Sequence, residues 1–386
     1  MTQGNPSQTA LLDCHVHYAD PGFKDGLIRI MDELGVQKFN IVCTPHPTRL
    51  SLVPDALHLK AHFPERVYVF GGLDISAFFT AGEKAGHVFA EYVDTLLAMG
   101  CDGIKMIEGK PDMRKMLHVP PFDGAMYEPY WEKMESTQTP LIFHVNDPAE
   151  FWDADKIPDW AQRSGWFYGD GTFINNETQY TEILHVFTRH PTLKIVFAHF
   201  FFLSHDLPRL AGYLDQFPGM HIDLTPGIEM YHDFSKNPEK ARDFMIKYQD
   251  RILFGTDIGA KALLATPQMG IEPAESRIRL ELVKSFLETD GEFTLDTSQG
   301  YLFNKFDGNF KGVNLPQEVL EKIGHANFEK LAGKSPHRLN PERIIPECER
   351  LALMVIAMGA AQPGQVGDPS VAKKISTFFA DWKIHS

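Results

Sequence analysis

The sequence predicts an α/β protein, a (β/α)8 TIM-type barrel with extra C-terminal helices. Eight short apolar runs recur between residues 10 and 257, and helix-length segments separate most of them. Hydrophobicity is nearly continuous within each run, as is typical of strands buried on both faces of a parallel sheet. Eight strands alternating with helices over about 250 residues is the pattern of this barrel. An open doubly wound sheet is the alternative, but it normally has a glycine-rich turn after its first strand, where this chain has His-Val-His.

The predicted strands follow one another along the whole of this region. In chain order they are Ala10–Cys14, Lys38–Thr44, Arg66–Leu73, Cys101–Ile107, Pro140–Val145, Leu193–His199, Met220–Leu224 and Arg251–Asp257. Four of the segments between them have an apolar stripe at helical spacing, namely Gly22–Leu34, Val88–Met99, Glu177–Arg189 and Glu239–Tyr248.

The barrel domain is predicted to span residues 10–333, with a closing helical segment at 315–331. Residues 334–386 form an appended segment with helices predicted at 341–360 and 370–382. Two connections, 146–176 and 258–312, exceed the usual loop length and leave the carboxyl ends of strands, where barrel enzymes build their active sites. The aromatic side chains of the first connection either form a lid or pocket wall, or pack together to close a long loop.

Composition excludes several classes of function. The 386 residues carry 37 basic and 51 acidic side chains, a formal net charge of -14, which argues against nucleic acid or an anionic membrane as partner. No apolar run is long enough for a membrane span, and the amino terminus lacks a signal-peptide pattern. The four cysteines are far apart and form no Cys-x-x-Cys pair. We expect a cytoplasmic protein that acts on a small molecule, with a homodimer as a possible assembly.

Polar residues occur repeatedly at the carboxyl ends of the predicted strands. The first strand ends in His15 and His17, the fifth in His144, the sixth in His199 and the eighth in Asp257. A single histidine at a strand end is usually structural, but four histidines and one aspartate meeting at one rim of the barrel are unusual. Imidazole and carboxylate groups are ligands for zinc, manganese or iron. The pattern therefore predicts a metal site.

This constellation resembles the amidohydrolase superfamily, and within it the branch of aminocarboxymuconate-semialdehyde decarboxylase, resorcylate-type decarboxylases, lactone hydrolases and hydratases. The resemblance covers roughly residues 10–333. The matching segments are Leu11–His17, Leu141–His144, Lys194–His199, Leu253–Asp257 and Leu315–Leu331.

The resemblance implies one divalent metal ion, zinc or alternatively manganese, held by His15, His17, His144 and Asp257. It also implies catalytic roles for Asp257, as the group that moves a proton, and for His199. The expected function is metal-dependent hydrolysis of a lactone, ester or amide by an activated water. Non-oxidative decarboxylation of a carboxylated aromatic or muconate-like substrate is the alternative. A barrel that has lost its chemistry is disfavoured, because no ligand or proton-transfer position is replaced.

Two features depart from the pattern of the branch or leave a role open. Phe200–Phe202 follow His199 where a run of glycines is common, so the substrate pocket is expected to differ. Lys105 lies near the end of the fourth strand; it could be a carbamylated bridge between two metals, a cation for a substrate carboxylate, or part of a structural pair. Arg49, like Lys110, is either a substrate-binding cation or a solvated loop charge.

Overall fold

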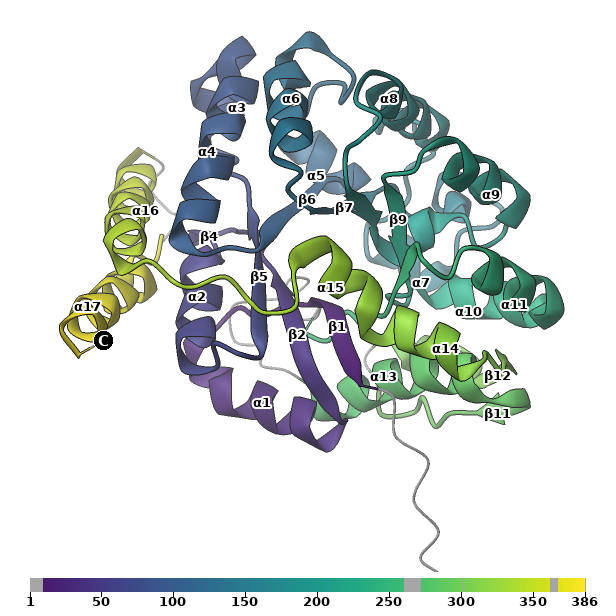
Figure 1. Ribbon diagram of the computed structural model, residues 1–386. Helices are drawn as coiled ribbons and strands as arrows, with labels where there is room; N and C mark the ends of the chain where they lie inside the picture. Colours follow the sequence, from purple (N-terminus) through teal and green to yellow (C-terminus); the bar gives the residue numbers. More distant parts are fainter. Residues whose placement is uncertain (1–9, 260–271, 301, 362–366, 386) are drawn as a thin grey trace, which may run out of the picture.

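The computed structural model describes residues 10–259, 272–300, 302–361 and 367–385. Eight strands form one sheet in the order β1-β2-β5-β6-β7-β8-β9-β10, and all neighbouring pairs are parallel. Figure 1 shows these strands at the centre of the molecule with helices arranged around them. The predicted barrel is therefore confirmed.

All eight predicted strands form, with boundaries shifted by a few residues. They are β1 (Leu11–Val16), β2 (Val36–Val42), β5 (Val67–Gly72), β6 (Gly103–Gly109), β7 (Leu141–Val145), β8 (Ile195–Phe197), β9 (Met220–Asp223) and β10 (Ile252–Leu253). The first and last strands are joined by backbone hydrogen bonds. The amide of Cys14 donates to the carbonyl of Phe254, and the amide of Asp257 to that of His15, each at 2.9 Å. These bonds nearly close the ring and place the residues after β10 beside the end of β1.

A helix follows each barrel strand and buries its apolar stripe against the sheet. The eight are α1 (Lys24–Glu33), α2 (Val53–His62), α4 (Ala85–Met99), α6 (Glu128–Thr137), α8 (Asn176–Arg189), α9 (Leu207–Gln216), α11 (Pro238–Lys247) and α13 (Pro273–Glu288). The four helices predicted from their stripes correspond to α1, α4, α8 and α11. Shorter helices are α3 (Ala77–Thr80), α5 (Pro111–Met116), α7 (Asp159–Arg163) and α10 (Ile228–Lys236).

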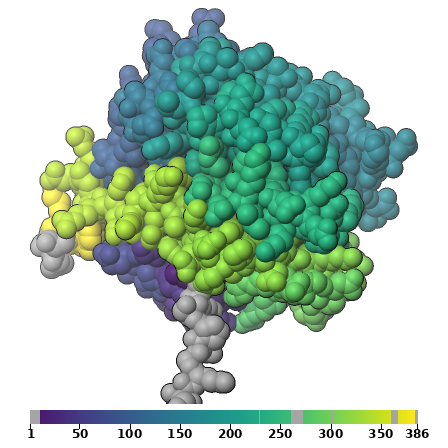
Figure 2. All heavy atoms as spheres, turned by 45° about the vertical axis from the view of Figure 1, so that its right-hand side comes forward, coloured from purple at the N-terminus to yellow at the C-terminus, as the bar shows by residue number. Residues whose placement is uncertain are grey.

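The predicted closing segment covers the amino ends of the strands. It consists of α14 (Gln317–Glu321), a π-helical turn at 322–326 and α15 (Asn327–Ala332). Phe328 packs against side chains inside the barrel, including Leu12 and Tyr68, which lie near the starts of their strands. Figure 1 shows this segment crossing the barrel, and in Figure 2 it is coloured lime and lies on the surface of the barrel. Because this segment blocks the barrel at the amino ends of the strands, an active site can open only at their carboxyl ends.

The expected long loop at 258–312 is the main error in the predicted organisation. Its residues 260–271 and 301 lie outside the described residues, but the remainder contains α13 and a hairpin of β11 (Asp290–Thr294) and β12 (Asn309–Val313). Apolar side chains of α13, such as Leu282 and Phe286, are completely buried, so this segment is part of the barrel wall. A second small pair, β3 (Pro45–His46) with β4 (Leu50–Ser51), follows β2.

The two appended helices are confirmed as α16 (Pro341–Ala361) and α17 (Ser370–His385). They pack against each other and against α4 and α2 on the outside of the barrel, at the left of Figure 1. In the described part of the chain, no helix combines the length and the hydropathy that a membrane span requires.

Candidate metal centre and active-site cavity

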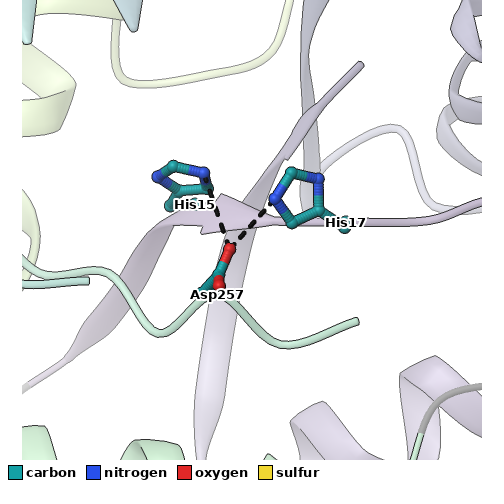
Figure 3. Close-up of side chains that lie close together, drawn as sticks. All are labelled: His15, His17 and Asp257. Carbon is teal, nitrogen blue, oxygen red and sulfur yellow. Dashed lines mark ion pairs between the residues drawn. The ribbon is translucent and has the colours of Figure 1, made fainter. Parts of the chain in front are cut away.

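Two histidines and one aspartate meet where β1 lies beside the residues that follow β10 (Figure 3). Nε2 of His17 lies 3.0 Å from Oδ1 of Asp257, and Nε2 of His15 lies 3.8 Å from the same oxygen. The three candidate ligand atoms lie within 4.8 Å of one another, and all three residues are buried. Two imidazole nitrogens and a carboxylate oxygen at this spacing fit zinc or another first-row divalent ion.

Asp223, the last residue of β9, fixes the ring of His15. Its Oδ2 accepts a hydrogen bond from Nδ1 of His15 at 2.9 Å, and its Oδ1 accepts one from the backbone amide of His199 at 2.9 Å. A hydrogen on Nδ1 leaves Nε2 of His15 as a lone-pair donor within the cluster. Burial holds the pKa of His15 well below its usual value, so the ring is neutral, the form that binds a metal.

Arg279 of α13 holds the other carboxylate oxygen of Asp257. Its Nη1 donates to Oδ2 of Asp257 at 3.2 Å, and its Nε donates to Glu275 at 3.2 Å. Burial acts to raise the pKa of Asp257, but the hydrogen bond from His17 and the charge of Arg279 outweigh it and keep the pKa well below its usual value. Asp257 is therefore an ionised carboxylate whose Oδ1 faces the two histidines.

His144, near the end of β7, is tied to the 146–176 segment. Its Nε2 lies 3.3 Å from Oδ1 of Asp147, whose Oδ2 accepts hydrogen bonds from Nζ of Lys110 and, at 2.7 Å, from Tyr168. Although burial acts to raise the pKa of Asp147, the charge of Lys110 keeps it well below its usual value. The ionised Asp147 thus holds His144 at the site, where the ring centres of His144 and His199 lie 4.9 Å apart.

His199 begins a left-handed turn that continues through Phe202. The φ angles of these four residues are 54°, 57°, 58° and 52°, in the region that side chains with a Cβ rarely adopt. The turn directs the ring of His199 into the site, where Nδ1 lies 3.2 Å from the carbonyl oxygen of Thr225. Burial, with a contribution from His144, lowers the pKa of His199 to about 3, so this ring is neutral as well.

Lys105 lies directly beside the cluster. Its Nζ is 3.3 Å from Nε2 of His15, and burial lowers its pKa to about 8. Among the described residues it forms no ion pair with a carboxylate, so its ammonium group can contact a substrate oxygen.

Arg49 is placed elsewhere, and its position does not support the predicted role in substrate binding. Its Nη1 donates to the buried carboxylate of Asp55 at 2.6 Å, and its Nη2 donates to the carbonyl of Ala19. The guanidinium is thus committed to structural contacts, and Arg49 does not line the cavity described next.

A cavity of about 220 Å³ opens over the cluster at the carboxyl ends of the strands. His15, His17, His144, His199, Lys105 and Asp257 all line it, so the structure brings together every predicted site residue except Arg49. Much of the remaining wall is aromatic, from Phe151, Trp160, Trp166 and Phe202. The aromatic residues of 146–176 therefore serve both expected purposes, since they line the cavity and also form a hydrophobic cluster of their own.

Comparison with known families agrees with the fold. The sequence profile of a family described as amidohydrolase matches residues 12–333, which is most of the chain. The chain belongs to the amidohydrolase family. The resemblance drawn from the strand-end motifs is thereby confirmed, and the protein is an enzyme of this kind.

Solved structures share the fold of this amidohydrolase at low identity. A 2,6-dihydroxybenzoate decarboxylase in complex with 2,6-dihydroxybenzoate is 14% identical with a TM-score of 0.51, over 84% of this chain and 98% of that chain. A 4-oxalomesaconate hydratase from Rhodopseudomonas palustris is also 14% identical with a TM-score of 0.51, over 84% of this chain and 96% of that chain. These likenesses establish a common architecture only. No protein with a curated description matches the sequence.

Three residues that shape the site of this amidohydrolase were not predicted, and one of them is Asp147, three residues after His144 in the long connection. Asp223 ends a strand that was predicted, and applying the strand-end argument to that strand would have found it. Arg279 lies in the segment taken for a loop. The signal there was the apolar spacing of its helix, at Ile278, Leu282, Val283 and Phe286.

Proposed function

We propose that this amidohydrolase uses one divalent metal ion, zinc or alternatively manganese, held by His15, His17 and Asp257 with His144 as a further ligand. The proposal is supported by the buried donor set and by the hydrogen bonds of Asp223 and Asp147, which orient the two histidines they contact. Carboxylates that hydrogen-bond to ligand histidines fix the ring and raise its basicity.

We further propose that the reaction is hydrolysis of a C–O or C–N bond, in a lactone, ester or amide. The observation that carries this choice is the cavity wall, whose described residues are largely aromatic and leave Lys105 as the cation without a carboxylate partner, because Asp147 neutralises Lys110. A bound divalent ion supplies Lewis acidity, which polarises a carbonyl and makes a water more acidic. A substrate with several carboxylates would find a single unpaired cation, Lys105, in the wall formed by the described residues.

The protein groups can then be assigned to the steps of hydrolysis. A water oxygen adds to the carbonyl carbon, and the carboxylate of Asp257 accepts the proton that this water loses. As the bond to the leaving oxygen or nitrogen breaks, Asp257 returns the proton to that atom, acting as base and then as acid. The neutral ring of His199 lines the same cavity and is suited to hydrogen-bond the carbonyl oxygen or the water.

Decarboxylation is the second candidate, favoured by the position of Lys105. Its ammonium group, 3.3 Å from the His15 ring, is placed to hold a substrate carboxylate beside the cluster. In that reaction the bond between the carboxylate and its carbon breaks and carbon dioxide leaves. His199 is the group proposed to pass a proton to the carbon, and because its ring is neutral it would first take up that proton from a water.

Elemental analysis and a two-sided activity screen test the proposal. We expect about one equivalent of zinc or manganese per chain, lost when His15 and His17 are both replaced by Ala. Purified protein is then incubated with lactones and aryl esters, and separately with carboxylated aromatics while carbon dioxide is monitored. Turnover of the first set supports hydrolysis, and turnover of the second alone supports decarboxylation. Protein that binds no metal while both histidines are intact would refute the metal-dependent mechanism.

A further inference from the structure

Glu229 differs from Asp257 and Asp147, two other acidic residues that line the cavity. It lies in the first turn of α10, after β9, and its carboxylate folds over Gly227, where an added Cβ would come within 2.8 Å of Oε1. Asp257 and Asp147 each have a cationic partner. Within the described part of the chain, Glu229 forms no ion pair, and its carboxylate accepts a hydrogen bond from its own backbone amide.

The surroundings of Glu229 are strongly negative. Burial and the nearby carboxylates of Glu150, Asp233 and Asp147 raise the pKa of Glu229 to about 8. An ionised carboxylate in such a place is costly unless a cation neutralises it. Among the described residues no cation is left to neutralise it, because Lys110 pairs with Asp147, Lys236 pairs with Asp233 and Lys105 lies beside His15.

The aromatic part of the wall suits a cation as well. Nζ of Lys110 already lies 5.0 Å from the ring centre of Trp166, so one ammonium group of the protein uses this face. Trp160 meets Trp166 edge-to-face at 5.6 Å, and both line the cavity. Indole rings combined with an unpaired carboxylate are the groups that recognise organic cations.

We propose that the substrate carries a cationic nitrogen, such as a protonated amine, that pairs with Glu229 while its reactive group lies at the His15, His17 and Asp257 cluster. The inference rests on the proposed function, because it assumes that the cavity over this cluster binds the substrate. It identifies Glu229 as a specificity-determining residue and the substrate as a compact, partly apolar molecule with a positive end.

Three benzoates that differ only at the para position test this assignment. They are 4-(aminomethyl)benzoate, 4-(hydroxymethyl)benzoate and terephthalate, with a cationic, a neutral and an anionic substituent respectively. Isothermal titration calorimetry on the purified protein at neutral pH should rank them in that order. We expect the first to bind roughly ten-fold more tightly than the second. Failure of 4-(aminomethyl)benzoate to bind, or equal affinity for the first two, would overturn the proposal.

Variants of Glu229 assign the preference to this side chain. Glu229→Gln should reduce the ten-fold preference to nearly one, and Glu229→Asp should retain part of it. Glu318→Gln, an exposed glutamate on α14, is the matched control and should leave the preference unchanged. Thermal midpoints identify any variant that fails to fold, and the independent Gly227→Ala should weaken the preference by displacing the carboxylate. A preference that persists in Glu229→Gln would refute the role of Glu229.

The outcome is separable from that of the proposed function. Metal content and turnover are measured on the same sample, and the calorimetry requires neither. A protein that shows the preference but binds no metal would contradict the proposed function alone. A metal-dependent hydrolase with no preference among the three benzoates would contradict this inference alone.

Discussion

Replacing Phe201 tests whether aromatic packing holds the left-handed turn that positions His199. Phe201 has φ 58° and ψ 20°, and its ring stacks on Phe197 at 4.0 Å between ring centres. The hydroxyl of Tyr180 donates to the Phe201 carbonyl at 3.0 Å. Loss of the ring should cost about 3–5 kcal/mol of unfolding free energy, whether Ala or Gly replaces it.

The unfolding free energies of Phe201→Gly and Phe201→Ala should differ in the opposite direction to that seen at most positions. At ordinary positions Gly is less stable than Ala by roughly 0.5–1 kcal/mol, because the unfolded glycine chain has more freedom. At φ 58° the Cβ of Ala costs about 1–2 kcal/mol, and Gly avoids this cost. We therefore expect Phe201→Gly to be more stable than Phe201→Ala by about 1 kcal/mol.

Urea denaturation followed by circular dichroism measures this difference. The matched control is the same pair of substitutions at Phe234, which is equally buried but lies within helix α10. There Ala should be more stable than Gly by about 1 kcal/mol, the usual helical order. If Phe201→Gly is less stable than Phe201→Ala, as at Phe234, the left-handed backbone at Phe201 does not impose the cost of about 1–2 kcal/mol on a Cβ.

Three further predictions concern the site and its surroundings. Asp223→Asn should weaken zinc binding roughly 10- to 100-fold, because the His15 ring loses its carboxylate partner. Competition with a chelator measures this affinity, and an unchanged zinc affinity would contradict the role of Asp223. Asp257→Asn should abolish turnover while the urea midpoint changes little by comparison, and retained activity would remove Asp257 from proton transfer. Burial raises the pKa of Glu108 from 4.5 to about 7, so its folded form retains a proton and wild-type stability falls as pH rises from about 4.5 to 7. Glu108→Gln should not lose stability over this range. The difference in unfolding free energy between Glu108→Gln and wild type should therefore shift in favour of the variant by up to about 3 kcal/mol between pH 4 and pH 8. Equal pH dependence of the two urea midpoints would contradict the raised pKa.

The fold was predictable because buried parallel strands leave a local signal. Each strand is a short apolar run, and helices α1, α4, α8 and α11 have regular stripes. The signal weakened where apolar and polar residues were mixed over a long connection. Helix α13 was missed for this reason, although its buried face completes the wall of the barrel.

The site was predictable to the extent that it follows strand ends. His15, His17, His144 and Asp257 meet because parallel strands bring their carboxyl ends to one rim. Contacts that depend on side-chain direction could not be read in the same way. For example, whether Arg49 points into the cavity or toward Asp55 depends on the path of the loop after β2, which a single sequence does not encode in any local pattern.

Charge on two length scales bears on the choice of substrate. The net charge of -14 repels anions at a distance, although salt screens this field beyond about 8 Å at physiological ionic strength. Within the cavity, Asp147 neutralises Lys110, so Lys105 is the cation left for a substrate carboxylate or carbonyl among the described residues. A muconate-like dianion is therefore disfavoured during both approach and binding. A substrate with one acidic or carbonyl group at Lys105 and a cationic nitrogen at Glu229 avoids both penalties, so the electrostatics of the whole chain and of its cavity favour the same class of molecule.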